Sequence, residues 1–197
     1  MAWMRGPIEL AQVRRALGGA APRAELERAR RAAVAVVLAP SGAPGGALSL
    51  LLMRRSEREG DPWSGHMALP GGHAHRADAD LLHTARRETL EEVGIDLSDA
   101  ELLGALDDVS PMRSSEIAVR PFVFALAALR EVALSDEVAE ALWVPLDSLA
   151  SGALKRTTDV IVRGATLRVP AHIIEERVVW GMTFHVLERF LSEVADH

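Results

Sequence analysis

Three glutamates near the middle of the chain have the residue type and spacing that metal-assisted phosphoryl chemistry requires. Glu88, Glu91 and Glu92 stand at positions i, i+3 and i+4, so a helix would carry them on one face. Such close like charges repel, and Arg87 offsets only part of that repulsion. A divalent cation compensates better, and oxygen ligands suit Mg²⁺ or Mn²⁺ rather than softer metals. A solvated acidic face is the alternative that the pattern alone leaves open.

The residues around these acids resemble a family motif. Arg87-Glu-Thr-Leu-Glu-Glu-Val-Gly-Ile95 is similar to the end of the Nudix box, R-E-U-x-E-E-x-G-U, where U is a bulky aliphatic residue and this chain has Thr89 at the first such position. Pro70-Gly-Gly72 precedes it. The resemblance implies an α/β fold, namely a Nudix-type α/β/α sandwich with a mixed β-sheet. It also implies one Nudix hydrolase domain over residues 1–197, with residues 1–31 as an N-terminal helical extension, and Mg²⁺ or Mn²⁺ as the cofactor.

The resemblance further implies roles for individual residues. Glu88, Glu91 and Glu92 are expected as metal ligands, with Glu91 binding directly or through water. Gly72 would let a nearby backbone carbonyl approach the metal. Glu88 and Glu91 also belong to the expected catalytic group, together with Arg87, which would orient a carboxylate by a charge-assisted hydrogen bond. The metals would polarise the diphosphate and lower the pKa of the attacking water.

The base that accepts a proton from that water varies within the family, and two acids outside the box are candidates. Glu137 and Glu140 precede the end of a predicted strand, and Glu137 is included among the expected catalytic residues. Each of them, taken singly, fits an ordinary exposed acid at a strand end better.

One departure from the box affects its glycine and its first acid. Counting back from Arg87, the family pattern places a glutamate at 79 and a glycine at 73, where this chain has Ala79 and His73. Gly72 and Asp78 keep the internal spacing of that glycine and acid, so one extra residue stands before the arginine. The same offset is expected in the coenzyme A pyrophosphatase-like branch of the family.

Segments upstream resemble that branch as well. Leu51-Leu-Met-Arg-Arg-Ser56 and Gly65-His-Met-Ala-Leu-Pro-Gly-Gly72 match most of its signature, L-L-T-x-R-S-x3-R-x3-G-x3-F-P-G-G, although Gly60-Asp61 stands where the second arginine is expected. The resemblance implies a small-molecule substrate, coenzyme A or a thioester, cleaved to 3′,5′-ADP and a 4′-phosphopantetheine product. Arg55 is expected to hold a phosphate by paired hydrogen bonds, and Trp63 to stack on a base or to pack against a neighbouring loop.

Histidines and a second tryptophan give weaker signals. His66, His73 and His75 suggest zinc, but no cysteine or fourth regular ligand accompanies them, so histidines lining a turn or facing solvent are the better interpretation. The segment Trp180-Gly-Met-Thr183 is similar to one in the same branch, and a tryptophan in that position is usually part of the core.

The elements that must position these residues follow from periodicity and turn residues. Helices are predicted over Pro7–Leu17, Glu25–Arg31, Asp80–Val93 and from about Val178 to Val194. Strands are predicted over Ala32–Ala39, Ala47–Arg54, Glu101–Leu106, Ile117–Leu126 and Ala139–Val144. The first two strands form a hairpin, and a further hairpin is expected over Val160–Ile174. Glu57–Gly65 is predicted as a loop, and Pro70-Gly-Gly72 as a tight turn. The mixture predicts helices packed on a sheet.

The composition fits one globular domain. The chain has 197 residues, of which 49% are hydrophobic and 25% charged, and it contains no cysteine, which excludes disulfides and thiol nucleophiles. Its apolar runs are too short for a membrane span or a secretory signal, so a cytoplasmic protein without membrane contact is expected. The net charge of −6 argues against nucleic-acid binding, and the basic residues within the first 31 fit a solvated face better than a binding arm. A homodimer stays open.

Several functions compete with coenzyme A cleavage. Isopentenyl diphosphate isomerase shares the Nudix fold but relies on a cysteine, which is absent here. Non-catalytic Nudix ligand-sensing modules commonly lose box glutamates, whereas this chain keeps all three. Pyrophosphohydrolysis of ADP-ribose or of nucleoside triphosphates stays open, because the fold alone does not separate these substrates.

Overall fold

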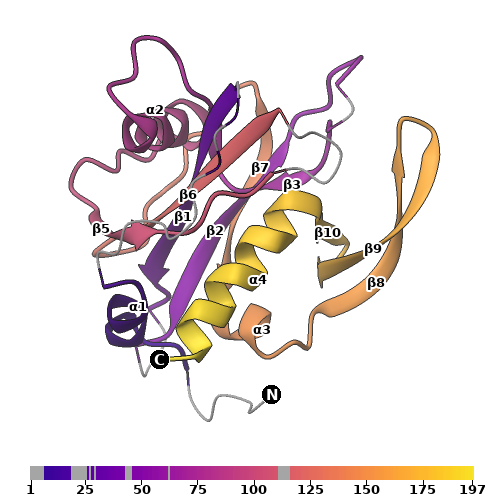
Figure 1. The fold of residues 1–197 in the computed structure, drawn as a ribbon. Helices are drawn as coiled ribbons and strands as arrows, with labels where there is room; N and C mark the ends of the chain where they lie inside the picture. The colour runs from indigo at the N-terminus through magenta and orange to yellow at the C-terminus, as the bar shows by residue number, and fades with distance from the viewer. Residues whose placement is uncertain are drawn as a thin grey trace.

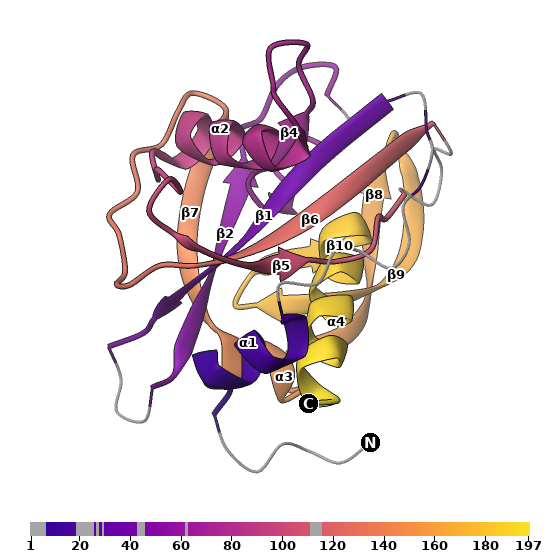
Figure 2. The ribbon, with the colours of Figure 1, turned by 60° about the vertical axis from the view of Figure 1, so that its left-hand side comes forward.

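A computed structural model describes residues 7–18, 26, 28, 30–42, 46–61, 63–110 and 116–197. These residues form a seven-stranded mixed sheet with helices on both faces (Figures 1 and 2). Its strands are β1 (Arg30–Pro40), β2 (Leu48–Arg55), β3 (Met67–Ala68), β4 (Gly71–His73), β5 (Glu101–Ala105), β6 (Ile117–Ala125) and β7 (Val138–Pro145). The strand order is β3-β2-β1-β6-β5, with β4 paired to β1 and β7 paired to β2.

Strand β1 lies at the centre of this sheet. Its residues from Ala32 to Ala39 are buried, as a run of alanine, valine and leucine requires when both faces of a strand are covered. It runs parallel to β6 and antiparallel to β2 and β4. The sheet is therefore mixed, and the predicted β1–β2 hairpin is confirmed by the pairing of Leu38 with Leu50.

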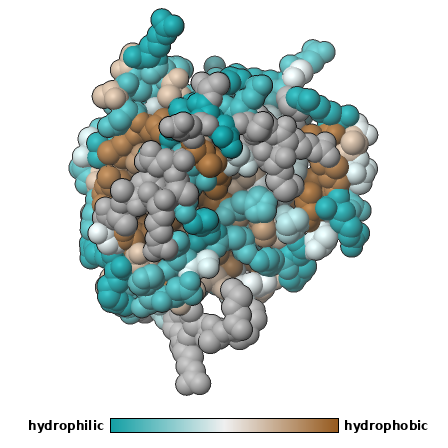
Figure 3. Space-filling view, viewed as in Figure 1, coloured by the Kyte–Doolittle hydropathy of each residue, from teal (hydrophilic) through white to brown (hydrophobic). Residues whose placement is uncertain are grey.

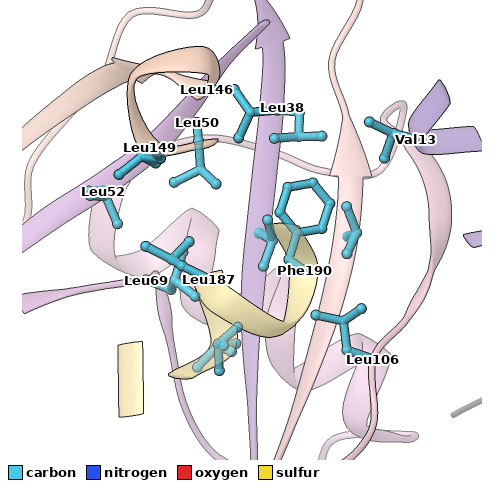
Figure 4. Packing of buried hydrophobic residues seen from close by; sticks show 14 of the residues in the cluster. Val13, Leu38, Leu50, Leu52, Leu69, Leu106, Leu146, Leu149, Leu187 and Phe190 are labelled. Atoms are coloured by element: carbon cyan, nitrogen blue, oxygen red, sulfur yellow. The ribbon is translucent and has the colours of Figure 1, made fainter. Parts of the chain in front are cut away.

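Helices cover the two faces of the sheet, which confirms the predicted α/β/α arrangement (Figures 1 and 2). Helix α2 (Leu81–Val93) lies on one face, and α1 (Leu10–Leu17) and α4 (Gly181–Ala195) lie on the other. Alternate residues of β1 belong to the two cores, with Val37 on the α2 side and Leu38 on the α4 side. Figure 4 shows Leu38 and Phe190 in the core beneath α4, near α3 (Leu146–Ala150).

A second, three-stranded antiparallel sheet follows the main one in sequence. It contains β8 (Lys155–Val162), β9 (Ala165–Ile174) and β10 (Arg177–Trp180). The predicted hairpin is confirmed and turns at Arg163 and Gly164, with φ angles of 50° and 76°, as a two-residue type I′ turn requires. Figure 1 shows this hairpin projecting from the rest of the molecule.

The surface agrees with this arrangement. On the face shown in Figure 3, hydrophilic residues predominate around the rim, and apolar surface is visible in two separate areas. Among the described residues, no helix is long and apolar enough to cross a membrane.

Two helix predictions near the N-terminus are partly wrong. Helix α1 begins at Leu10 rather than at Pro7, because Glu9 has an extended backbone. The predicted helix over Glu25–Arg31 overlaps β1, which starts at Arg30 and pairs with β6. A valine-rich sequence paired in register with the parallel strand β6 favours a strand there. Residues 25, 27 and 29 lie outside the described part of the chain, and so do Arg5 and Arg23.

Two further boundaries differ from prediction. Residues 178–180 are in β10, paired with β9, so the last helix begins at Gly181 rather than near Val178. Extended β-branched residues gain ladder hydrogen bonds there that a helix would forgo. The Pro-Gly-Gly segment is also more than a tight turn, because Gly71 and Gly72 belong to β4 and pair with β1.

Candidate active site

Helix α2 directs Glu92 toward the sheet. The helix begins after Asp80, whose carboxylate accepts a hydrogen bond from the His83 amide at 2.7 Å. Glu92 is only 4% exposed, and its Oε2 accepts a hydrogen bond from the Gly71 amide at 2.8 Å. Burial raises the pKa of Glu92 to about 8, the Gly71 amide opposes this shift, and the charge of Glu88 adds to it. A cation beside Glu92 would favour its charged form.

Glu88 lies one turn earlier on the same helix and faces Gly72. A side chain at Gly72 would place its Cβ 2.5 Å from Glu88 Oε1, so only glycine leaves that carboxylate its present position. Glu88 Oε1 also accepts a hydrogen bond from Arg87 Nη1 at 2.9 Å. Strand β4 and helix α2 therefore meet where Glu88, Glu92 and the backbone of two glycines come together.

Arg87 is held by Asp78, for which no role was predicted from the sequence. The Arg87 Nε donates to Asp78 Oδ1 at 2.9 Å, and Nη2 donates to Asp78 Oδ2 at 3.0 Å. The paired hydrogen bonds lower the pKa of the buried Asp78 carboxyl, and the same bonds raise the pKa of Arg87. Arg87 Nη1 also donates to Glu91 Oε2 at 2.8 Å, so the guanidinium links Asp78 to two box glutamates. The sequence signal for this role of Asp78 was its position, because it keeps the box spacing from Gly72 and precedes Arg87.

The three box glutamates differ in exposure. The side chain of Glu91 is 57% exposed, whereas Glu92 is buried. Within the described residues, no group of three or more histidine, cysteine, aspartate or glutamate side chains is arranged to hold a metal ion. Glu88, packed against Gly72, and Glu92, bonded to the Gly71 amide, nevertheless supply neighbouring carboxylate oxygens, and hard oxygen donors of this kind suit Mg²⁺ or Mn²⁺.

Arg55 and Glu137 lie near this carboxylate group. Both affect the pKa of Glu92 through their charges, Arg55 lowering it and Glu137 raising it. Arg55 Nη2 donates to Asp61 Oδ2 at 2.8 Å, and Arg58 Nη1 donates to Glu137 Oε1 at 3.1 Å. Both arginines of this loop are thus paired with carboxylates.

Glu140, the other proposed base, has different neighbours. It accepts hydrogen bonds from Arg177 and from Arg54 Nε, the latter at 3.3 Å, and these bonds lower its pKa. Of the two acids, Glu137 is the one whose charge raises the pKa of Glu92. Glu140 forms ion pairs with Arg54 and Arg177 instead.

The three histidines considered for zinc do not meet. His66 lies beside Trp63 and Trp180, whereas His73 Nε2 is 3.3 Å from Arg30 Nη2. His75 donates its amide to Asp78 Oδ2 at 2.9 Å. This placement agrees with turn-lining histidines rather than with a shared site.

Comparisons with known proteins identify the family of this chain. The NUDIX domain family model matches residues 28–163. The human mitochondrial coenzyme A diphosphatase NUDT8 is 34% identical over 92% of this chain and 76% of its own length. An uncharacterised Schizosaccharomyces pombe protein is 45% identical to this chain over 107 residues, which is 51% of the chain. The matched region covers only 32% of that protein's length.

A solved structure supports the fold. The crystal structure of a MutT/nudix family protein from Enterococcus faecalis has a TM-score of 0.58 at 19% identity, covering 87% of this chain and 64% of the other. Enzymes of this family generally use divalent metal ions. The match over residues 28–163, the similarity to the human relative and the box glutamates on α2 lead to one conclusion: this chain belongs to the Nudix hydrolase family.

Proposed function

We propose that this Nudix hydrolase uses Mg²⁺ or Mn²⁺ to cleave the diphosphate of coenzyme A or one of its thioesters. The products would be 3′,5′-ADP and 4′-phosphopantetheine or its acylated form. The observation that carries the proposal is the placement of Glu88 and Glu92 against the glycine backbone of β4, with Arg55 within electrostatic range of Glu92. The name of the human relative, a coenzyme A diphosphatase, supports the choice of substrate.

Each residue of the site has a distinct task in this reaction. Glu88 and Glu92 would hold the metal, with Glu91 binding directly or through water and a carbonyl near Gly72 completing the set. When bound, the ion neutralises the diphosphate and lowers the pKa of the attacking water. Arg87 keeps Glu88 and Glu91 in place through its hydrogen bonds, so less reorganisation is needed when substrate enters.

Glu137 and Arg55 act on the substrate side. Glu137 would take the proton from water as the water oxygen attacks one phosphorus and the anhydride P–O bond breaks. This requires Glu137 to part from Arg58. Arg55 would keep its bond to Asp61 and donate its remaining N–H groups to a phosphate, which a guanidinium does better than an ammonium.

A product analysis tests the reaction directly. Purified protein is incubated with coenzyme A, acetyl coenzyme A, ADP-ribose, NADH and nucleoside triphosphates, with Mg²⁺, with Mn²⁺ or with EDTA. We expect cleavage of coenzyme A at the diphosphate, loss of activity in EDTA and recovery with either metal. Turnover that survives thorough chelation would contradict the metal requirement, and a higher kcat/KM for ADP-ribose or a triphosphate would contradict the substrate.

Arg55→Ala tests how the substrate is held. We expect it to lower kcat/KM for coenzyme A more than for dephospho-coenzyme A, which lacks the 3′-phosphate. Arg54→Ala is the matched control, because Arg54 precedes it on β2 but pairs with Glu140. If both variants lose the same activity on both substrates, Arg55 does not read the 3′-phosphate.

Partners and location stay predictions. We propose a small nucleotide-type diphosphate as the ligand and no nucleic-acid or membrane partner, and a homodimer is left open. The cytoplasmic location expected from the sequence is likewise a proposal, and the human relative is named as mitochondrial.

A further inference from the structure

Three aromatic side chains from distant parts of the chain meet near Arg55, the last residue of β2. The ring centroid of Trp63 lies 5.9 Å from that of His66 and 6.2 Å from that of Trp180, and the His66 and Trp180 centroids are 5.2 Å apart. Their planes are inclined by 45° to 69°, so no two rings form a parallel stack. Trp180 ends β10, and the other two belong to the loop between β2 and β3.

The three rings differ in how far solvent reaches them. His66 and Trp180 are half-buried, whereas Trp63 is 47% exposed. A tryptophan that served only as packing would normally be covered more completely. The two half-buried rings support Trp63 from below while much of its own surface stays open.

One carboxylate fixes this tryptophan relative to a cation. Asp61 Oδ1 accepts a hydrogen bond from the Trp63 amide at 2.9 Å, and Asp61 Oδ2 accepts one from Arg55 Nη2 at 2.8 Å. The amide, and then the guanidinium, lower the pKa of Asp61, so the carboxylate stays charged. The backbone of Trp63 and the guanidinium of Arg55 are therefore bound to the same carboxylate.

Arg55 also connects the aromatic group to the acids of the active site. Its charge acts on His66 on one side and on Glu92 on the other. Its backbone amide donates to the His66 carbonyl at 3.0 Å, which ties β2 to the segment carrying the rings. A ligand with a flat ring at one end and a phosphate next to it would match this order of groups.

We propose that Trp63, supported by His66 and Trp180, is the surface on which the base of a nucleotide stacks, with Arg55 beside the adjoining phosphate. The inference rests on the proposed function in placing that nucleotide in the substrate. A base offers a π-face, which the flexible pantetheine chain lacks, and stacking on tryptophan tolerates any base. The platform therefore recognises an aromatic ring next to a phosphate rather than one hydrogen-bonding pattern.

AMP and ribose 5-phosphate test this proposal, because they differ only in the base. Their dissociation constants are measured by calorimetry on the full chain with Mg²⁺, and neither ligand contains a diphosphate to be cleaved. We expect the wild type to bind AMP more tightly. Trp63→Ala should weaken AMP binding about tenfold, as loss of base–aromatic stacking does, and leave ribose 5-phosphate unchanged. Trp63→Phe should retain most of the affinity for AMP.

Leu102→Ala is the matched control, since Leu102 is an apolar residue of similar exposure, 40%, on β5. It should leave both affinities unchanged. Equal binding of AMP and ribose 5-phosphate by the wild type would overturn the proposal, as would an unchanged AMP affinity in Trp63→Ala. 4′-Phosphopantetheine is measured alongside them, and a loss in Trp63→Ala confined to that ligand would overturn the proposal by assigning the rings to the other end of the substrate. Because these are binding measurements, a base site without coenzyme A turnover would refute only the proposed function.

Discussion

At the scale of single residues, two charged layers surround the acids of α2. Glu88 and Glu92 lie against the glycines of β4, and Arg87 holds Glu88 from the opposite side. Asp78 in turn holds Arg87 by two hydrogen bonds. A change in the inner layer should abolish the reaction, and a change in the outer layer should weaken it.

Glu88→Gln and Glu92→Gln test the inner layer. Each should lower kcat by more than the roughly tenfold to hundredfold that loss of an outer contact to a metal ligand costs. Steady-state kinetics and Mn²⁺ affinity by electron paramagnetic resonance check this. Glu101→Gln, on exposed β5, is the control and should keep full activity. Normal Mn²⁺ affinity and turnover in either box variant would place the metal elsewhere.

Asp78→Asn tests the outer layer. Removing one charge weakens the fork that orients Arg87, so Mn²⁺ affinity should fall roughly tenfold to hundredfold. The contrast with His83→Gln is informative, because His83 is an exposed neighbour 3.2 Å from the same carboxylate and should matter little. A lower melting temperature with unchanged Mn²⁺ affinity would show that Asp78 serves the fold alone.

At the scale of elements, the contact between β4 and α2 determines the shape of the site. Gly71 has a φ of +151° and lies so close to β1 that a Cβ would come within 2.3 Å of the Ala33 carbonyl oxygen. At Gly72 the obstructing atom is instead the end of a side chain, Glu88. Neighbouring glycines thus serve different purposes, one for the sheet and one for the acid.

Substituting alanine at each glycine should separate these purposes. Gly72→Ala should lower Mn²⁺ affinity and activity with a small change in melting temperature, because Glu88 can rotate away. Gly71→Ala should destabilise the protein by about 1–3 kcal/mol or more, because backbone atoms cannot give way so easily. Thermal unfolding and metal titration of both variants check this. Identical effects of the two substitutions would contradict the assignment.

Much of this arrangement could be predicted from the sequence. Helix α2 could be predicted, because Asp80 and Gly94 mark its ends and its apolar residues are regularly spaced. Strand β4 could not, since three residues with two glycines have no periodicity and become a strand only through pairing with β1. The Trp63–Trp180 contact depends on tertiary structure, and no local signal could reveal it.

At the scale of the whole molecule, α4 joins the two sheets, and a buried histidine lies at that joint. His172 on β9 is fully buried, with Nε2 3.0 Å from Glu188 Oε1 on α4 and its ring 5.1 Å from that of Phe184. Burial lowers the pKa of His172; Glu188 opposes this shift, and Lys155 adds to it.

The stability of the protein should therefore depend on pH below neutrality. The folded-state pKa of His172 is below the unfolded value of 6.5, so its contribution is complete above pH 6.5. That contribution is lost as pH falls toward the folded pKa, because the unfolded chain takes up the proton more readily. Glu92, whose pKa is raised to about 8, acts in the opposite sense over this range, so urea unfolding between pH 7 and 5 should show the His172 contribution as a difference between wild type and His172→Gln.

His172→Gln should reduce that loss, because glutamine can still donate to Glu188 but does not titrate. His185→Gln, which replaces an exposed histidine on α4, is the control variant. His66 also has a lowered pKa through burial, and Glu92 contributes with the opposite sign, so the slope should change by the His172 part alone rather than vanish. An identical slope in wild type and His172→Gln would mean that protonation of His172 does not contribute to the pH dependence of stability.

The way β4 and α2 are anchored has a consequence for how this enzyme can change over generations. Strand β4 is fixed by its ladder to β1, and α2 starts independently at the Asp80 cap. The seven residues between them, 74–80, can gain or lose a member without shifting the register of the sheet or the phase of the helix. The extra residue that this chain carries lies between Asp78 and Arg87, and residues 79 and 80 of that stretch precede the helix. Mutation can thus reshape the rim of the active site while its acids stay in place.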